Sequence, residues 1–185
     1  MNTPSVVTDR HGPVQALIEG LHAAMAAIPE SLIALLGRFS IAAVFWNSGQ
    51  TKVEGFAINL VSGTFDIGVP RLSESAVALF RDEYQLPLLP PELAAWLATI
   101  GEHALPVLLL LGLGTRFAAL GLLVMTAVIQ LLVYPGAYAT HGVWAAVLLW
   151  LLARGPGRLS VDHYLAVRGS RPMNRPIGRR SIRLP

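Results

Sequence analysis

Four long apolar segments, each close to the length needed to cross a lipid bilayer, most constrain how this chain folds. They cover about residues 31–51, 92–112, 116–134 and 138–153. An α-helix rises about 1.5 Å per residue, so about 20 apolar residues cross the hydrocarbon of a membrane. The sequence therefore predicts an integral membrane protein with four transmembrane helices.

The composition supports lipid as the surrounding medium. Hydrophobic residues make up 54% of the 185 residues and charged residues only 14%, against roughly 25% charged residues in soluble domains. The absence of cysteine excludes disulfides, thiol relays, zinc held by thiolates and iron–sulfur clusters. No metalloprotease, dithiol, di-iron, dinucleotide or P-loop pattern occurs.

The segments between the spans define the rest of the fold. A short turn at 112–116 joins the second and third spans, so these helices must be antiparallel neighbours. The outer loop at 52–91 is too long for a simple connection, and its stretch 73–84 predicts a short amphipathic helix. The predicted fold is therefore all-α: an integral membrane, antiparallel four-helix bundle with a short helix in the first outer loop.

An amphipathic surface helix is predicted over residues 14–28, within an N-terminal region at 1–30. Its apolar residues recur at helical spacing, which is typical of a helix that lies on the membrane surface. A signal peptide is the alternative interpretation, but Glu19 and His22 interrupt its apolar core.

The basic residues predict the orientation. Eight of the 14 lie in the segment that begins at Arg154, together with the single acid Asp162. Because cytoplasmic segments are rich in arginine and lysine, this basic tail at 155–185 and Arg116 should face the cytoplasm. The four spans at 31–154 then place both termini in the cytoplasm. Nothing in the sequence indicates nucleic-acid binding.

Charged residues inside the spans are the candidates for chemistry, since charge is costly in hydrocarbon. Arg38 and Glu102 lie about 10 and 15 Å from the cytoplasmic face at 1.5 Å per residue, so we expect them to pair. Two interpretations stay open: a structural ion pair that fixes helix register, or a site for a proton, a quinone head group or a polar substrate.

One face of the first span carries most of its candidate residues. Arg38, Ala42, Phe45, Gly49 and Lys52 share it, and its small residues would let another helix approach closely. Lys52, near the outer surface, either extends its ammonium to that surface or takes part in the interior site.

Two histidines are further candidates. His141 begins the fourth span on the outer side, and His103 adjoins Glu102 near mid-membrane. Their unequal depths fit a single haem poorly, and with the methionines they form no recognisable soft-metal site. The sequence therefore predicts no metal centre, and no cofactor is evident; a bound quinone is the cofactor that remains open.

Three groups of residues follow one another in an informative order: Arg38 with Phe45, Gly49 and Lys52, then EHALPVLLLLGLGTR at 102–116, then GPGRLSVD at 155–162. This pattern resembles the DoxX family of bacterial inner-membrane proteins over about residues 31–165. The stretch FRDEYQLPLLPP at 80–91 resembles a branch of that family with an extended first loop. The resemblance marks Arg38, Lys52, Glu102 and Arg116 as recurrent polar positions.

The resemblance implies a four-helix protein of the bacterial inner membrane with a loose link to oxidoreductase systems. Family members share their name with a small subunit of a thiosulfate:quinone or terminal quinol oxidase, and others are linked to oxidative-stress complexes. We therefore expect an accessory membrane subunit of a redox system. The alternatives are a transporter or export helper for a small ligand or metal, and a scaffold for a partner protein. Each of these three functions is compatible with partner proteins of redox or metal-stress systems. Each is also compatible with a homo-oligomer.

Overall fold

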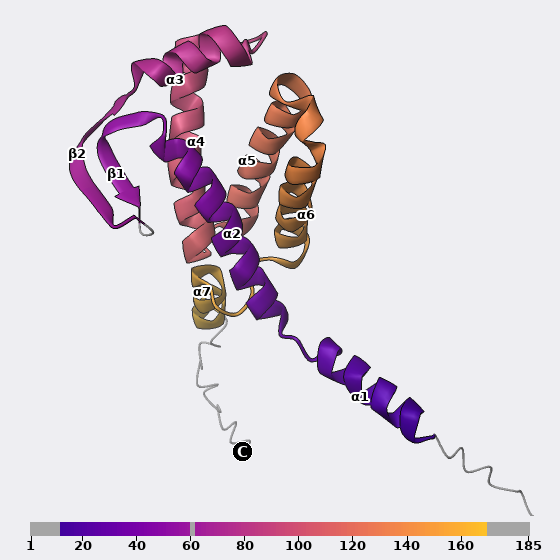
Figure 1. Ribbon diagram of the computed structural model, residues 1–185. Helices are drawn as coiled ribbons and strands as arrows, with labels where there is room; N and C mark the ends of the chain where they lie inside the picture. The colour runs from indigo at the N-terminus through magenta and orange to yellow at the C-terminus, as the bar shows by residue number, and fades with distance from the viewer. Residues whose placement is uncertain (1–11, 60–61, 170–185) are drawn as a thin grey trace, which may run out of the picture.

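The computed structural model describes residues 12–59 and 62–169. Four apolar helices form the body of the protein (Figure 1). They are α2 (Glu30–Gln50), α4 (Pro91–Leu111), α5 (Thr115–Val128) with the π-helical turn η2 (Ile129–Val133), and α6 (Tyr138–Arg154), which the 3-10 turn η3 (Pro135–Ala137) precedes. All four are long and apolar enough to cross a membrane, close to the predicted segments. The four predicted membrane helices are therefore confirmed.

The helices pack around an apolar core that runs through the bundle. α2 packs mainly on α4, and α5 packs mainly on α6 and also on α4. Small side chains at the contacts let the helices approach, as expected where lipid surrounds the bundle. The buried members of the core are Ala34, Ile41, Phe45, Leu109, Ala118, Ala119, Leu122, Leu148 and Leu151.

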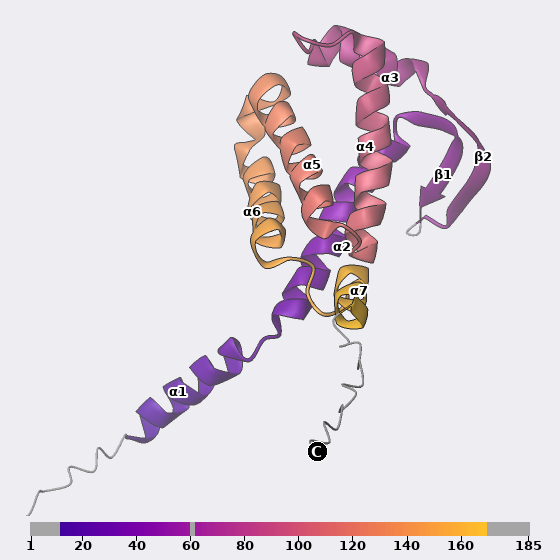
Figure 2. The ribbon, with the colours of Figure 1, turned by 180° about the vertical axis from the view of Figure 1, so that it is seen from behind.

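The long loop between α2 and α4 contains a β-hairpin, so the prediction of an all-α fold is wrong in this segment. Strands β1 (Val53–Asn59) and β2 (Thr64–Leu72) pair antiparallel. The signal was present: Phe56 and Ile58 alternate with small or polar residues, as do Phe65 and Ile67 in β2, which is the period of a strand. Both views show the hairpin beside α2 and α4 (Figures 1 and 2).

The predicted loop helix is present and caps the end of the bundle opposite α7 (Figure 1). It begins as α3 (Glu74–Ala78), where the Ser73 hydroxyl accepts a hydrogen bond from the Ala76 amide, and continues as the π-helical turn η1 (Leu79–Tyr84). Its Phe80 packs on Ala94 and Ala95 near the start of α4.

The first part of the predicted basic tail folds back onto the bundle. Helix α7 (Val161–Gly169) follows a turn at 155–160, and the Asp162 carboxylate accepts hydrogen bonds from the amides of Gly114 (2.8 Å) and Thr115 (2.9 Å). Burial alone would raise the pKa of Asp162, but these amides and the charge of Arg38 hold it below its usual value. The five tail arginines beyond Arg168 lie outside the described residues.

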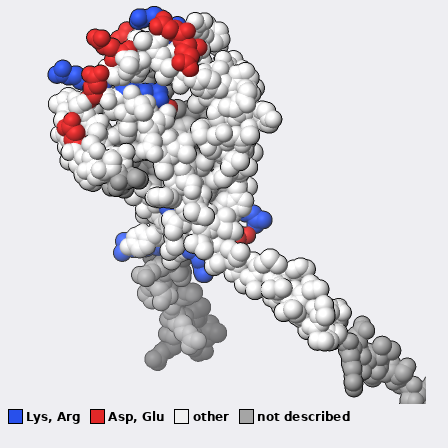
Figure 3. All heavy atoms as spheres, viewed as in Figure 1, with Lys and Arg blue, Asp and Glu red and all other residues white. Residues whose placement is uncertain are grey.

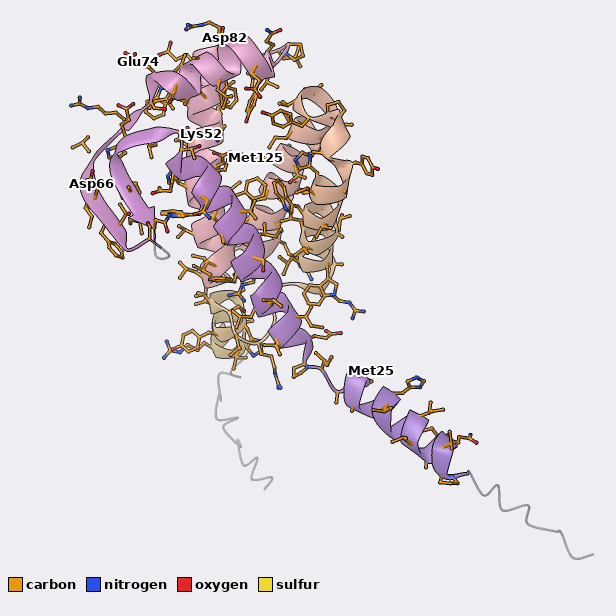
Figure 4. All side chains as sticks on the ribbon, viewed as in Figure 1. Met25, Lys52, Asp66, Glu74, Asp82 and Met125 are labelled. Carbon is orange, nitrogen blue, oxygen red and sulfur yellow. The ribbon has the colours of Figure 1, made fainter. Side chains whose placement is uncertain are left out.

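Helix α1 (Pro13–Ala26) stands apart from the bundle, and all its side chains are exposed (Figure 1). A helix is therefore present over most of the predicted segment 14–28, and its placement on the membrane surface stays a prediction. Most charged side chains gather at the α3 end and near the α7 end, and the surface between them is largely uncharged apart from Asp66 on the hairpin (Figures 3 and 4). This distribution is the one expected of a protein whose middle lies in lipid.

Candidate functional site

A buried ion pair joins the end of α2 to the middle of α4. Lys52 Nζ lies 2.7 Å from Glu102 Oε2, and each side chain is 4% exposed. Glu102 is the twelfth of the 21 residues of α4, so the pair lies near the centre of a membrane-spanning helix. The prediction that Lys52 could extend to the outer surface is therefore wrong.

Ser48 connects the two charges. Its hydroxyl donates to Glu102 Oε1 at 3.1 Å and accepts from Lys52 Nζ at 3.0 Å. The ammonium also donates to the Ser48 carbonyl at 3.1 Å. A buried ion pair persists only when such hydrogen bonds replace lost water, and Ser48, one turn before Lys52, supplies them from the same helix.

Gly49 explains why α2 and α4 come so close. A Cβ atom there would lie 2.8 Å from His103 Cε1 and 3.1 Å from Glu102 Cβ. The predicted face of α2 is confirmed, because Arg38, Ala42, Phe45 and Gly49 are all buried and Lys52 extends it.

His103 lies beside the ion pair and is hydrogen-bonded through both ring nitrogens. Its Nδ1 must donate to the Thr99 carbonyl (2.8 Å), because a carbonyl only accepts, so Nε2 accepts from Gln50 Nε2 (2.9 Å). The Gln50 side-chain oxygen in turn accepts from the Ile58 amide at 2.7 Å. His103 thus links α4 to α2 and, through Gln50, to the hairpin.

A cavity of about 320 Å³ begins at Ser48 and Glu102 and extends between α4 and α5 under η1. Met125 faces it from α5 (Figure 4). Leu97 and Val124 belong both to its wall and to the exposed surface, at 52% and 55%, so the cavity opens sideways toward lipid. Its other lining residues are Phe80, Tyr84, Leu86, Leu89, Ala94, Ala98, Val128, Ile129 and Val133.

The outer wall of the cavity comes from the first loop. Tyr84 of η1 packs edge-on against Tyr134 with 5.7 Å between ring centroids, and the Tyr134 hydroxyl donates to the Glu83 carboxylate. Burial raises the pKa of the Tyr84 phenol, so this phenol stays protonated near neutral pH.

Arg38 does not pair with Glu102, so that prediction is wrong. Its guanidinium donates to the carbonyls of Leu109 (2.8 Å) and Leu110 (2.7 Å) at the end of α4, and to those of Pro156 and Leu159 (both 2.8 Å). The last carbonyls of a helix lack partners within it, so they attract the guanidinium. Lys52, about 20 Å farther along α2, neutralises Glu102 instead.

The other two predicted site residues lie elsewhere. Arg116 is exposed at the α7 end, where it donates to the Ala153 carbonyl at 3.4 Å. His141 is buried on α6, with Nδ1 2.8 Å from Gln130 Oε1 and its ring against Trp144. Of the five candidates, only Lys52 and Glu102 meet. Ser48, which joins them, was not a candidate, because a single serine in an apolar helix carries no distinctive signal.

Comparison of the sequence with known proteins identifies a family. The family model described as DoxX matches residues 33–135, which run from α2 through the hairpin, α4 and α5. No curated protein and no solved structure shows a significant match to the chain. Because the match covers more than half of the sequence and includes both members of the buried ion pair, the chain belongs to the DoxX family of membrane proteins.

Proposed function

We propose that this protein is an accessory membrane subunit of a redox system and that its cavity binds the head group of a membrane quinone. The cavity is the observation that supports this proposal: it is apolar along its length, open to lipid and polar at one end. A quinone diffuses within the bilayer, so it would enter from the side on which Leu97 and Val124 lie.

The polar end has the hydrogen-bonding groups that such a head group requires. The Ser48 hydroxyl could donate to a quinone carbonyl, and the Glu102 carboxylate could accept from a quinol hydroxyl. Ligand sites of this kind are mostly apolar, with a few polar groups that fix orientation. The residues therefore fit a quinone, which would supply the electron chemistry when bound; this chain would bind and orient it.

The orientation proposed from the arginines accompanies this function. The end with α7, Arg116, Arg154 and Arg158 would face the cytoplasm, and α3 would face outward. Helix α1 would lie on the cytoplasmic membrane surface with its exposed apolar side chains in lipid. In a bacterium this membrane would be the inner membrane.

Quinone content tests the proposal. The protein is purified from its own membranes in lipid nanodiscs, and extracted quinone is quantified by chromatography. Wild type should retain quinone, Ala98→Trp should lose most of it because the indole fills the cavity, and Glu102→Gln should retain less. Leu36→Trp, at an exposed position of α2, is the matched control. Equal quinone in all four proteins would contradict the proposal.

A further inference from the structure

A second cavity, of about 610 Å³, lies at the α7 end of the bundle. Its walls come from the start of α2, the end of α6, the turn at 155–160 and the start of α7. Figures 1 and 2 both show these segments at the same end of the molecule. Because two membrane-spanning helices end here, the cavity lies level with one membrane surface, where lipid head groups lie.

The backbone around this cavity is held firmly on α2. The Arg158 amide donates to the Ser31 hydroxyl at 3.0 Å, and the Arg38 guanidinium donates to the Pro156 carbonyl at 2.8 Å. The turn also packs closely, since a Cβ atom on Gly157 would lie 2.9 Å from Ser31 Cα. The walls of the cavity are therefore part of the packed structure.

Two arginine side chains line the cavity with most of their donors unused. Among the described residues, the Arg158 guanidinium has no hydrogen-bond or ion-pair partner. Arg154 Nη1 lies 3.4 Å from Glu30 Oε1, and these two side chains are 62% and 67% exposed. An exposed pair of this kind adds little stability, so Arg154 is free to bind another anion. Each guanidinium has five N–H groups to offer.

The acids of the cavity wall do not neutralise both arginines. Asp162 belongs to the wall, but its carboxylate accepts hydrogen bonds from two amides of the neighbouring turn and faces the charge of Arg38. Glu30 is the other carboxylate of the wall, and it faces Arg154 and Arg158. Two guanidinium groups therefore share one carboxylate, which leaves the cavity positively charged.

An apolar surface begins directly beside these charges. In the first two turns of α2, Leu32, Ile33 and Leu36 are 55%, 46% and 64% exposed. On α6, Leu149 is 55% exposed and lies about one and a half turns before Arg154. A ligand in the cavity therefore has positive charge on one side and a hydrocarbon-facing surface on the other.

We propose that this cavity binds the head group of an anionic phospholipid, with its phosphate between Arg154 and Arg158 and its acyl chains along α2 and α6. Hydrogen bonds from a guanidinium to a phosphate are charge-assisted and often bidentate, and basic pockets between membrane helices suit such head groups. A free phosphate would use the arginines but not the apolar surface beside them. The site is separate from the cavity at Glu102, so it does not depend on quinone binding.

Native mass spectrometry of the full chain tests this site. The protein is delipidated in detergent, and phosphatidylglycerol or phosphatidylcholine is added at equal concentration. Wild type should retain phosphatidylglycerol in preference. The double variant Arg154→Gln/Arg158→Gln should bind it on the order of tenfold more weakly, because two positive charges are lost. Arg71→Gln/Arg81→Gln is the matched control, since it removes the same charge from exposed positions near the opposite end of the bundle and should bind like wild type.

A second variant should strengthen binding, which a misfolded protein could not do. Glu30→Gln removes the carboxylate that competes for Arg154, so the affinity for phosphatidylglycerol should rise about fivefold for one charge. Glu92→Gln is its control. Glu92 lies in the first turn of α4, as Glu30 does in α2, but far from the cavity, so this variant should bind like wild type.

Three results would each overturn the lipid site. The first is equal phosphatidylglycerol binding by the two double-arginine variants. The second is equal retention of phosphatidylglycerol and phosphatidylcholine by wild type. The third is binding of the deacylated head group, glycerophosphoglycerol, as tightly as the intact lipid, which would assign the arginines to a free phosphate.

Discussion

Lys52 and Arg38, two buried cations of the described residues, are stabilised by different means. Lys52 faces one carboxylate, whereas Arg38 faces four backbone carbonyls. The planar guanidinium has five N–H groups in a fixed fork and can serve several acceptors at once, which an ammonium on a flexible chain cannot do with the same geometry. The two residue types therefore fit the two positions for chemical reasons.

The ion pair gives a prediction at this scale. Lys52→Met or Glu102→Leu alone leaves one buried charge without its partner, so each should lower the free energy of unfolding by about 3–5 kcal/mol. The double variant should recover much of that loss. Unfolding in mixed micelles, followed by circular dichroism, would measure wild type, the two single variants and the double variant, which together form a double-mutant cycle. Additive losses would show that the two charges do not interact.

At the scale of elements, Gly49 sets the separation of α2 and α4. Gly49→Ala should destabilise the bundle by about 1–3 kcal/mol, as overpacking does in tight cores, because its Cβ would overlap the His103 ring. Gly142→Ala on α6 is the control, since a Cβ there meets nothing within 4 Å. Midpoints of thermal unfolding would compare the two. A loss in Gly142→Ala as large as in Gly49→Ala would contradict the contact.

Docking of α7 should depend on pH through Asp162. The folded pKa of Asp162 is depressed, so its carboxylate stabilises the folded state above the unfolded pKa of about 3.9. That stabilisation is lost as pH falls through the folded value. The Gly114 and Thr115 amides should therefore be better protected from hydrogen exchange at neutral pH than at acid pH. Protection here means the exchange rate relative to the intrinsic rate at the same pH. Asp162→Asn should remove this gain.

The sequence predicted elements better than contacts. The four spans and the buried face of α2 follow from hydropathy and helical periodicity, which are local properties. The partner of Glu102 depends on the offset between α2 and α4, which no local pattern encodes, so Arg38 was paired wrongly. The hairpin was detectable from the alternation of Phe56 and Ile58, but helix-length apolar segments dominate the pattern. The cavity depends on where η1 lies and could not be predicted.

At the scale of the whole molecule, the two charged ends define the two membrane surfaces. A membrane-impermeant maleimide added to intact cells should label Glu74→Cys on α3 and should label Arg158→Cys only after lysis. Both positions are exposed, and the chain has no other cysteine. Labelling of Arg158→Cys in intact cells would reverse the proposed orientation.

The acceptors of Arg38 have a consequence for biosynthesis. The guanidinium enters the membrane with α2, yet two of its four carbonyls belong to Pro156 and Leu159, which the ribosome adds more than a hundred residues later. The α7 end of the bundle therefore reaches its final form only after residues 156–159 have been made. A chain that stops after α6 keeps this cation with two of its four carbonyl acceptors missing, at a depth where charge is costly.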